Sequence, residues 1–168
     1  MKSHWLWCYH LLTRWLPESR AFGVKAVLLR LAGAKVGRNV RIYSSAKFTG
    51  VGELEFGDDV HIGPAVVIAT ARPAKINIGS CVDIGPGAMI LSGSHEIDSV
   101  GEHIAGRGIA KPVTVGEGCW IGARSVILPG VELPRKTIVA AGAVVTKSVE
   151  VEQCLVAGVP ATVRKRYV

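Results

Sequence analysis

Large aliphatic residues recur at every sixth position along residues 115–149, and the fifth place of each block is small or β-branched. The aliphatic positions are Val115, Ile121, Ile127, Leu133, Val139 and Val145. A period of six fits neither the 3.6-residue turn of an α-helix nor a hairpin meander. It fits a short strand, a tight corner and another short strand, with one large side chain per strand pointing to a shared axis. The pattern therefore predicts a parallel β-helix.

The same phase continues upstream, and the blocks group in threes as triangular coils of eighteen residues. Five coils are predicted, at residues 36–53, 56–73, 78–95, 115–132 and 133–150. Two, four and nineteen extra residues follow the blocks that open at Phe48, Ile68 and Ile90. Each of these blocks is the third face of its coil. We therefore expect all extra residues to leave at one corner of the prism, with 91–114 as a long extruded loop inserted in the β-helix of residues 36–150.

Glycine often occupies the second place of a block, where a tight corner favours a residue free to adopt a positive φ. These glycines are Gly37, Gly57, Gly63, Gly79, Gly85, Gly116 and Gly122. We expect them to form the corners.

Residues 1–35 lack the period of six and predict two helices. The first, over 5–16, gathers apolar residues on one face, and Pro17 ends it; these residues are Trp5, Cys8, Tyr9, Leu12, Trp15 and Leu16. The second, over about 21–32, has a stop at Gly33. Its apolar side consists of Val24, Val27, Leu28 and Leu31.

We interpret this segment as an N-terminal cap that covers the open end of the first coil. Interfacial membrane binding by the Trp-rich face of residues 1–20 is a second interpretation, compatible with the first. No stretch is apolar for the length of a membrane span, and no signal-peptide cleavage pattern is present.

The net charge of +7 indicates an anionic partner. Aromatic residues are not interleaved with the basic ones in the repeats, which argues for a phosphorylated small molecule and against nucleic acid. The four cysteines, Cys8, Cys81, Cys119 and Cys154, lack disulfide-framework or metal-ligand spacing, so we expect a reducing cytoplasm and no metal.

The loop 91–114 is polar and Gly-rich, but Ile97, Ile104 and Ile109 suggest that it is ordered and packed on something. His95 falls at the end of the third coil, where the prism would hold it in place, as a catalytic base requires. Glu96 and Asp98 are candidates to orient an imidazole or to bind an acceptor. The simpler interpretation of His95 is a solvated loop residue.

Residues 151–168 form a C-terminal cap or tail. Gly158 and Pro160 predict a turn, and the end is basic, with Arg164, Lys165 and Arg166. It is either a solvated tail or a cap that carries positive charge to a cofactor groove.

Several motifs together resemble a known family: SHEID at 94–98, AKPVTVGEGCWIGARSVILPGV at 110–131, AAGAVVTK at 140–147 and AGVPA at 157–161. They are similar to the hexapeptide-repeat, left-handed β-helix acyltransferases, and within them to the maltose, galactoside and nodulation O-acetyltransferases. WLP at 15–17 and RLAGAKVG at 30–37 further resemble relatives encoded with capsule, O-antigen and colanic-acid pathways. The left hand of the coil is implied by this resemblance and not by the period.

The resemblance implies a homotrimer with acetyl-CoA as co-substrate in the groove between neighbouring prisms. His95 would be the general base that removes the proton of an acceptor hydroxyl, and the hydroxyl oxygen would attack the thioester directly. Trp120 would lie beside the acetyl and pantetheine end. The backbone of Gly122, Ala123, Ala141 and Gly142 would follow the pantetheine arm. Lys147, with Arg164 or Lys165, would approach the CoA phosphates.

The chain also departs from the sugar-specific branch. No asparagine stands at the place where the galactoside enzymes supply one for the acceptor, and Trp-rich helices replace their longer N-terminal acceptor segment. We therefore expect a larger, lipid-linked glycan as acceptor, acetylated in the cytoplasm at the inner face of the membrane.

Three alternatives remain. An N-acyltransferase of an amino sugar or nucleotide amino sugar would use the same fold and base. A zinc hydratase of the γ-carbonic anhydrase type would need three converging histidines, and His61, His95 and His103 lack the expected spacing. A non-catalytic β-helix scaffold would not need His95, Trp120 and Lys147 together.

Overall fold

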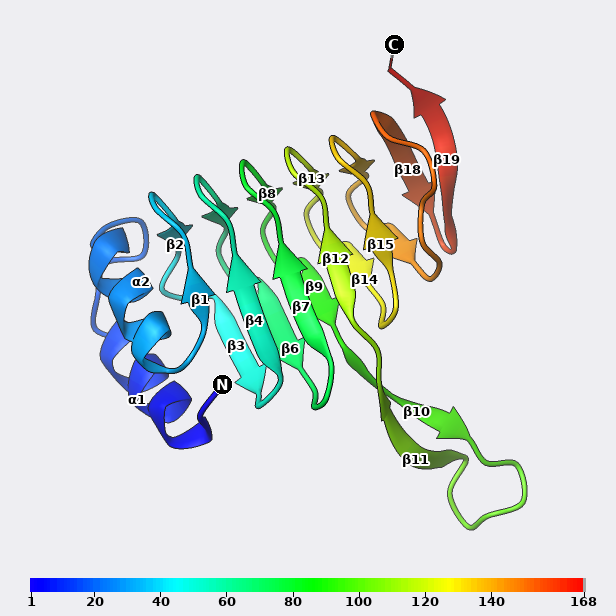
Figure 1. Ribbon diagram of the computed structural model, residues 1–168, viewed down its shortest axis with the longest axis horizontal. Helices are drawn as coiled ribbons and strands as arrows, with labels where there is room; N and C mark the ends of the chain where they lie inside the picture. Colours follow the sequence, from blue (N-terminus) through cyan, green and yellow to red (C-terminus); the bar gives the residue numbers. More distant parts are fainter. Residues whose placement is uncertain (168) are drawn as a thin grey trace.

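The computed structural model describes residues 1–167, which form two helices followed by a triangular prism of short parallel strands (Figure 1). Face A consists of β1 (Lys35–Val36), β4 (Glu53–Phe56), β7 (Lys75–Ile78), β12 (Val113–Val115) and β15 (Glu132–Leu133). Face B consists of β2 (Arg41–Ile42), β5 (His61–Ile62), β8 (Asp83–Ile84), β13 (Trp120–Ile121), β16 (Ile138–Val139), β18 (Cys154–Gly158) and β19 (Ala161–Arg166). Face C consists of β3 (Lys47–Gly50), β6 (Val67–Thr70), β9 (Met89–Leu91), β14 (Val126–Ile127) and β17 (Val144–Val145).

The predicted fold class, a left-handed parallel β-helix, is confirmed, with one more rung than expected. After the fifth coil, β18 pairs in parallel with β16 and adds a sixth rung to face B. β19 then turns back antiparallel to β18. The turn predicted at Gly158 and Pro160 is present, and the basic end is part of a sheet rather than a loose tail.

The aliphatic residues of the repeat stack in register along the axis. On face B, Ile42 is aligned with Ile62, Ile62 with Ile84, Ile84 with Ile121, and Ile121 with Val139. All five side chains are fully buried. A six-residue block therefore buries one large side chain per face, which is why the period was visible in the sequence.

The second-place glycines have a different role from the one expected. None of them has a positive φ; that conformation occurs two residues later, for example at Asn39, Asp59 and Arg124. A Cβ on Gly122 would lie 2.5 Å from the backbone nitrogen of Ala141 in the next coil. Glycine is needed at this place because the backbones of neighbouring coils approach too closely for a side chain.

All extra residues leave at the corner between faces C and A, here called corner CA, as predicted. The longest insertion is an antiparallel hairpin of β10 (Gly93–Ile97) and β11 (Ala105–Ala110) that projects away from the prism (Figure 1). Ile97 at its tip is 85% exposed, and Ile104 is also exposed. We expected the isoleucines of this loop to pack against another part of the protein, and within a single chain Ile97 and Ile104 do not.

The helices α1 (Ser3–Thr13) and α2 (Phe22–Leu31) cover the first coil, and Leu6, Tyr9 and Leu29 join the core of the prism. The predicted apolar faces are correct only in part: Tyr9 is buried and Leu28 packs against the core, whereas most of the other predicted positions are exposed. Trp5, Leu12 and Trp15 are exposed, while α1 buries Leu6, Tyr9 and Thr13. In α2 the predicted stripe is also largely exposed, and Lys25, Ala26 and Leu29 face inward.

Lys25 is completely buried and ties the connection between the two helices to α2. Its Nζ donates hydrogen bonds to the carbonyl oxygens of Pro17 and Glu18, each at 2.9 Å. Burial lowers the pKa of Lys25, and the nearby Glu18 partly opposes this shift. Within residues 1–167, neither helix has the length and apolar character needed to cross a bilayer.

Candidate active site

His95 lies on β10, two residues beyond the point where the hairpin leaves the prism. The prediction that it ends the third coil is wrong, because β9 stops at Leu91 and the chain then turns outward. Its position is nevertheless defined by the opposite strand. The Nδ1 atom lies 2.9 Å from the carbonyl oxygen of Gly106. A carbonyl only accepts, so Nδ1–H is the donor, and in the neutral ring Nε2 carries the free lone pair.

The hairpin is anchored at its base by Ser92, which is fully buried. The Ser92 hydroxyl accepts a hydrogen bond from the backbone N–H of Ala71 at 2.8 Å, and its carbonyl accepts one from Lys111 N–H at 2.9 Å. A cavity of about 390 Å³ lies between this base, His95 and residues 71–72. His95 therefore borders a site large enough for part of a substrate.

Arg72 also lines this cavity, although it was not among the site residues predicted from the sequence. Its Nε donates to the carbonyl oxygen of Val51 at 2.9 Å. Its place could have been predicted from the stacking of insertions at corner CA. Arg72 belongs to the four-residue insertion after β6, which lies directly under the hairpin.

Asp98 and Glu96, the candidate acceptor-binding residues, differ in their surroundings. The Asp98 carboxylate accepts hydrogen bonds from the backbone N–H groups of Val100 and Gly101, at 3.1 and 2.9 Å. It thus stabilises the tip of the hairpin. Glu96 is exposed on β10, next to His95.

Trp120 lies on face B, between Asp83 of β8 and Ile138 of β16. Its side chain points outward and is 57% exposed. A cavity of about 400 Å³ borders it, and Lys136 and Tyr167 contribute to the wall. The ammonium group of Lys165 lies 4.9 Å from the centre of the Tyr167 ring, so the basic C-terminal hairpin adjoins this cavity.

Gly122, Ala123, Ala141 and Gly142 lie at the corner between faces B and C, here called corner BC. Ala141 and Gly142 are exposed, and a Cβ on Gly142 would meet nothing within 4 Å. Small side chains leave the backbone of this corner open to an extended ligand.

Lys147 follows β17 and is exposed at corner CA. Arg164 and Lys165 are exposed on β19. None of these three cations takes part in an ion pair within residues 1–167.

The structure therefore divides the predicted site residues into two groups. His95, Glu96 and Asp98 are on the hairpin at corner CA. Trp120 lies on face B, which is opposite that corner, and the four small residues lie at corner BC. A single chain does not bring the two groups together.

The histidines are similarly dispersed. His61 is on face B, whereas His95 and His103 are on the hairpin. Across residues 1–167 no three His, Cys, Asp or Glu side chains are grouped in a way that would hold a metal ion. Cys119 is buried in the core, and burial raises the pKa of its thiol.

Comparison with known proteins agrees with this architecture. The family described as hexapeptide repeat of succinyl-transferase matches residues 112–147. A protein of Escherichia coli (strain K12), named as a colanic acid biosynthesis acetyltransferase, is 34% identical over 142 residues, which cover 84% of this chain and 70% of that protein. This chain belongs to the hexapeptide-repeat acetyltransferases. The resemblance found in the motifs is thereby confirmed, and the chain is an acyltransferase.

Two solved acyltransferase structures share the fold of this chain. An N-acyltransferase from Bacillus cereus, in complex with dTDP and 3-hydroxybutyryl-CoA, has a TM-score of 0.70 and 21% identity, covering 80% of this chain and 73% of that chain. A hexapeptide-repeat acetyltransferase from Vibrio cholerae, complexed with acetyl-CoA, has a TM-score of 0.69 and 24% identity, covering 98% and 86%.

Proposed function

We propose that this hexapeptide-repeat acetyltransferase transfers an acetyl group from acetyl-CoA to a hydroxyl of a sugar or polysaccharide precursor. The observation that carries the proposal is the hydrogen bond from His95 Nδ1–H to Gly106 O. It holds the imidazole in the tautomer whose Nε2 can accept a proton, at the edge of a cavity of about 390 Å³.

In the proposed reaction, Nε2 of His95 takes the proton of the acceptor hydroxyl as its oxygen attacks the thioester carbonyl. A bond forms between this oxygen and the acetyl carbon, and a tetrahedral oxyanion results. A backbone N–H would stabilise the oxyanion. When the intermediate collapses, the carbon–sulfur bond breaks, and the CoA sulfur receives the proton from His95. No covalent acyl-enzyme is required.

We further propose that the active site is assembled between two copies of the chain in a homotrimer. The hairpin of one copy, whose exposed tip carries Ile97, would reach a neighbour and bring His95 to that neighbour's Trp120. Acetyl-CoA would lie in the groove along corner BC. The small residues of that corner, Gly122, Ala123, Ala141 and Gly142, would accommodate its pantetheine arm.

Unpaired cations support the placement of the CoA phosphates. Arg164 and Lys165 belong to the hairpin next to the Trp120 cavity, whereas Lys147 is exposed at corner CA and would approach the phosphates from the neighbouring copy. Point charges and guanidinium groups of this kind bind phosphate through charge-assisted hydrogen bonds. The Vibrio cholerae acetyltransferase, solved with acetyl-CoA, supports acetyl-CoA as the acetyl donor.

For the acceptor we propose a large glycan, bound as a lipid-linked precursor in the cytoplasm at the inner membrane face. The relative named for colanic acid biosynthesis favours a polysaccharide acceptor. Glu96, exposed beside His95, would bind acceptor hydroxyls, and Asp98 would support the hairpin tip that carries it.

N-acylation of an amino sugar is the second candidate, favoured by the fold similarity to the Bacillus cereus N-acyltransferase. The same base would serve an amine. Acceptor preference distinguishes the two reactions.

The test is release of free thiol from acetyl-CoA by wild type and His95→Ala, with hydroxyl sugars, amino sugars and polyprenyl-linked glycans as acceptors. We expect acceptor-dependent release that is greatest with a polyprenyl-linked glycan and falls by about 10²-fold or more in the variant. Equal release by both proteins would exclude His95 as the base. Preference for an amine would establish N-acylation.

A further inference from the structure

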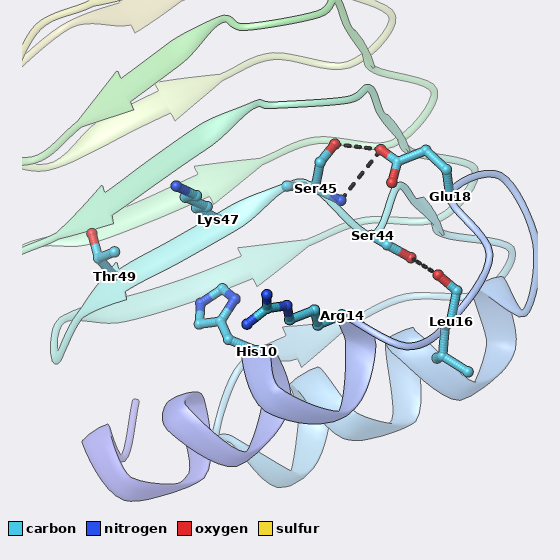
Figure 2. A pocket seen from close by; sticks show the side chains of 9 residues that line it. His10, Arg14, Leu16, Glu18, Ser44, Ser45, Lys47 and Thr49 are labelled. Carbon is cyan, nitrogen blue, oxygen red and sulfur yellow. Dashed lines mark hydrogen bonds between the residues drawn. The ribbon is translucent and has the colours of Figure 1, made fainter.

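A cavity of about 440 Å³ lies between the end of α1 and strand β3, at the first coil of the prism (Figure 2). His10 and Arg14 extend into it from the helix side, and Lys47 lies across from them on the strand (Figure 2). No part of the proposed acetyl transfer uses these three residues.

The cationic groups of this cavity are not neutralised by the protein. The ion pairs within residues 1–167 are Lys35–Glu55, Arg38–Asp58 and Lys75–Glu55, and neither Arg14 nor Lys47 belongs to them. Glu18 is the one carboxylate in the wall. Its Oε1 accepts hydrogen bonds from the backbone N–H and the hydroxyl of Ser45. The Glu18 carboxylate keeps its negative charge and offsets one of the two positive charges of Arg14 and Lys47, so the wall stays cationic.

The wall around these charges is well ordered. His10 Nε2–H donates to the carbonyl oxygen of Phe48 at 2.8 Å, which fixes the ring in the wall and makes Nδ1 of the neutral ring an acceptor, not a donor to phosphate. The Ser44 hydroxyl donates to the carbonyl oxygen of Leu16 at 3.0 Å and closes the far side. The guanidinium of Arg14 and the ammonium of Lys47 around one space suit a ligand with several oxygens and negative charge, such as a phosphate.

The outer surface beside this cavity is apolar. Trp7, Leu11 and Trp15 follow at intervals of four residues, so they line one side of α1 and its end, and they are 66%, 46% and 82% exposed. Residues 1–35 contain six Lys or Arg and a single acidic residue, Glu18. Exposed tryptophans next to a cationic site match a lipid surface with anionic headgroups, where rings enter the interface and cations bind phosphates.

We propose that the cavity of His10, Arg14 and Lys47 binds the phosphate of an anionic membrane phospholipid while Trp7, Leu11 and Trp15 insert into the interface. This inference specifies the membrane contact proposed above and does not depend on the acetyl transfer. The end of the prism that carries α1 would face the bilayer, and the hairpin with His95 would remain accessible to membrane-linked acceptors.

Co-sedimentation of the full chain with vesicles tests the proposal. Vesicles of phosphatidylcholine with 30% phosphatidylglycerol (about one third anionic lipid) are compared with phosphatidylcholine alone. We expect binding to the anionic vesicles and a loss of about ten-fold or more in Arg14→Gln/Lys47→Gln. The matched variant Lys2→Gln/Arg20→Gln removes the same charge from the same end of the molecule but outside the cavity. It should lose about three-fold or less.

Equal losses of vesicle binding in the two double variants would exclude the cavity as the phosphate site. Binding would then reflect only general attraction between the basic protein surface and the anionic membrane. Saturable binding of inorganic phosphate, detected as a shift of the His10 ring resonances, together with no vesicle binding, would show that the cavity binds free phosphate and not a phospholipid. A change of oligomeric mass on Trp7→Ser/Trp15→Ser, with no vesicle binding by wild type, would assign this surface to a second copy of the chain. Acetyl-CoA binding should stay at the wild-type level in every variant, which separates this result from failure of the proposed function.

Discussion

The Nδ1 atom of His95 lies 2.9 Å from the carbonyl oxygen of Gly106, across the two strands of the hairpin. This bond connects the candidate base to the opposite strand and determines which ring nitrogen carries the proton. The geometry of β11, and not only the identity of residue 95, therefore controls whether His95 can act as a base.

Two glycines of β11 provide a matched test of this relationship. A Cβ at Gly106 would lie 2.8 Å from Asp98 Cβ and 3.2 Å from Glu96 O, whereas a Cβ at Gly108 would meet nothing within 4 Å. We expect Gly106→Ala to displace the carbonyl and lower kcat by about ten-fold, because the hydrogen bond to His95 is weakened. Gly108 lines the His95 cavity, and its Cβ would not disturb this hydrogen bond, so Gly108→Ala should change the KM for the acceptor and leave kcat at the wild-type level. Equal behaviour of the two variants would refute a positioning role for Gly106.

The titration of His61 on face B follows from its neighbours. Burial lowers the pKa of His61 below 6.5, the adjacent Arg41 lowers it further, and Asp83 partly opposes the shift. The Tyr43 ring, with its centroid 5.3 Å from the imidazole centroid, also packs against it. An NMR titration of the ring should show a midpoint below 6.5 that falls further in Asp83→Asn and rises in Arg41→Gln.

This shift also makes stability depend on pH. The unfolded chain binds the proton at a higher pH than the folded one, so the contribution of neutral His61 is complete above pH 6.5. It should decrease as the pH falls toward the lowered pKa. His61→Gln should show a weaker dependence of the urea midpoint on pH across this window. A His61 midpoint at or above 6.5 would contradict the account.

The close approach of coils at second-place glycines predicts a large effect on stability. The Cβ of Gly122→Ala would be forced to 2.5 Å from Ala141 N, so the free energy of unfolding should fall by about 2 kcal/mol or more. Gly23 in α2 has open space at the Cβ position. Gly23→Ala should therefore raise the free energy of unfolding by about 0.5 kcal/mol through helix propensity. Urea unfolding of both variants makes the comparison, and a neutral Gly122→Ala would exclude the packing argument.

The coils were predictable because burial alone enforces their period. Each block must place one side chain, such as Ile62 or Ile121, on the axis, and neither an α-helix nor a hairpin meander produces that spacing. The corner of the insertions was predictable for the same reason. Arg72 was missed because only the stacking of insertions brings it under the hairpin.

The helices show the limit of this reasoning. A stripe of apolar residues indicates the buried face only when the other face is polar. In α2, Val24 and Val27 on the outside are more apolar than Lys25 on the inside, and Lys25 is accommodated by two carbonyl oxygens that only the fold brings together. The same logic applies to His95, whose partner Gly106 is determined by the register of the hairpin.

The central claim is that an active site is shared between two chains, and hybrid trimers test it most directly. His95→Ala removes the base, and Ala141→Trp fills the exposed corner BC proposed for acetyl-CoA. The two inactive chains are co-expressed with different tags and purified through both. In every hybrid trimer one of three interfaces then combines an intact His95 with an intact corner, so we predict about a third of the wild-type activity. A chain carrying both substitutions, paired with His95→Ala, should remain inactive. Hybrids of the two single variants without recovered activity would contradict a shared site.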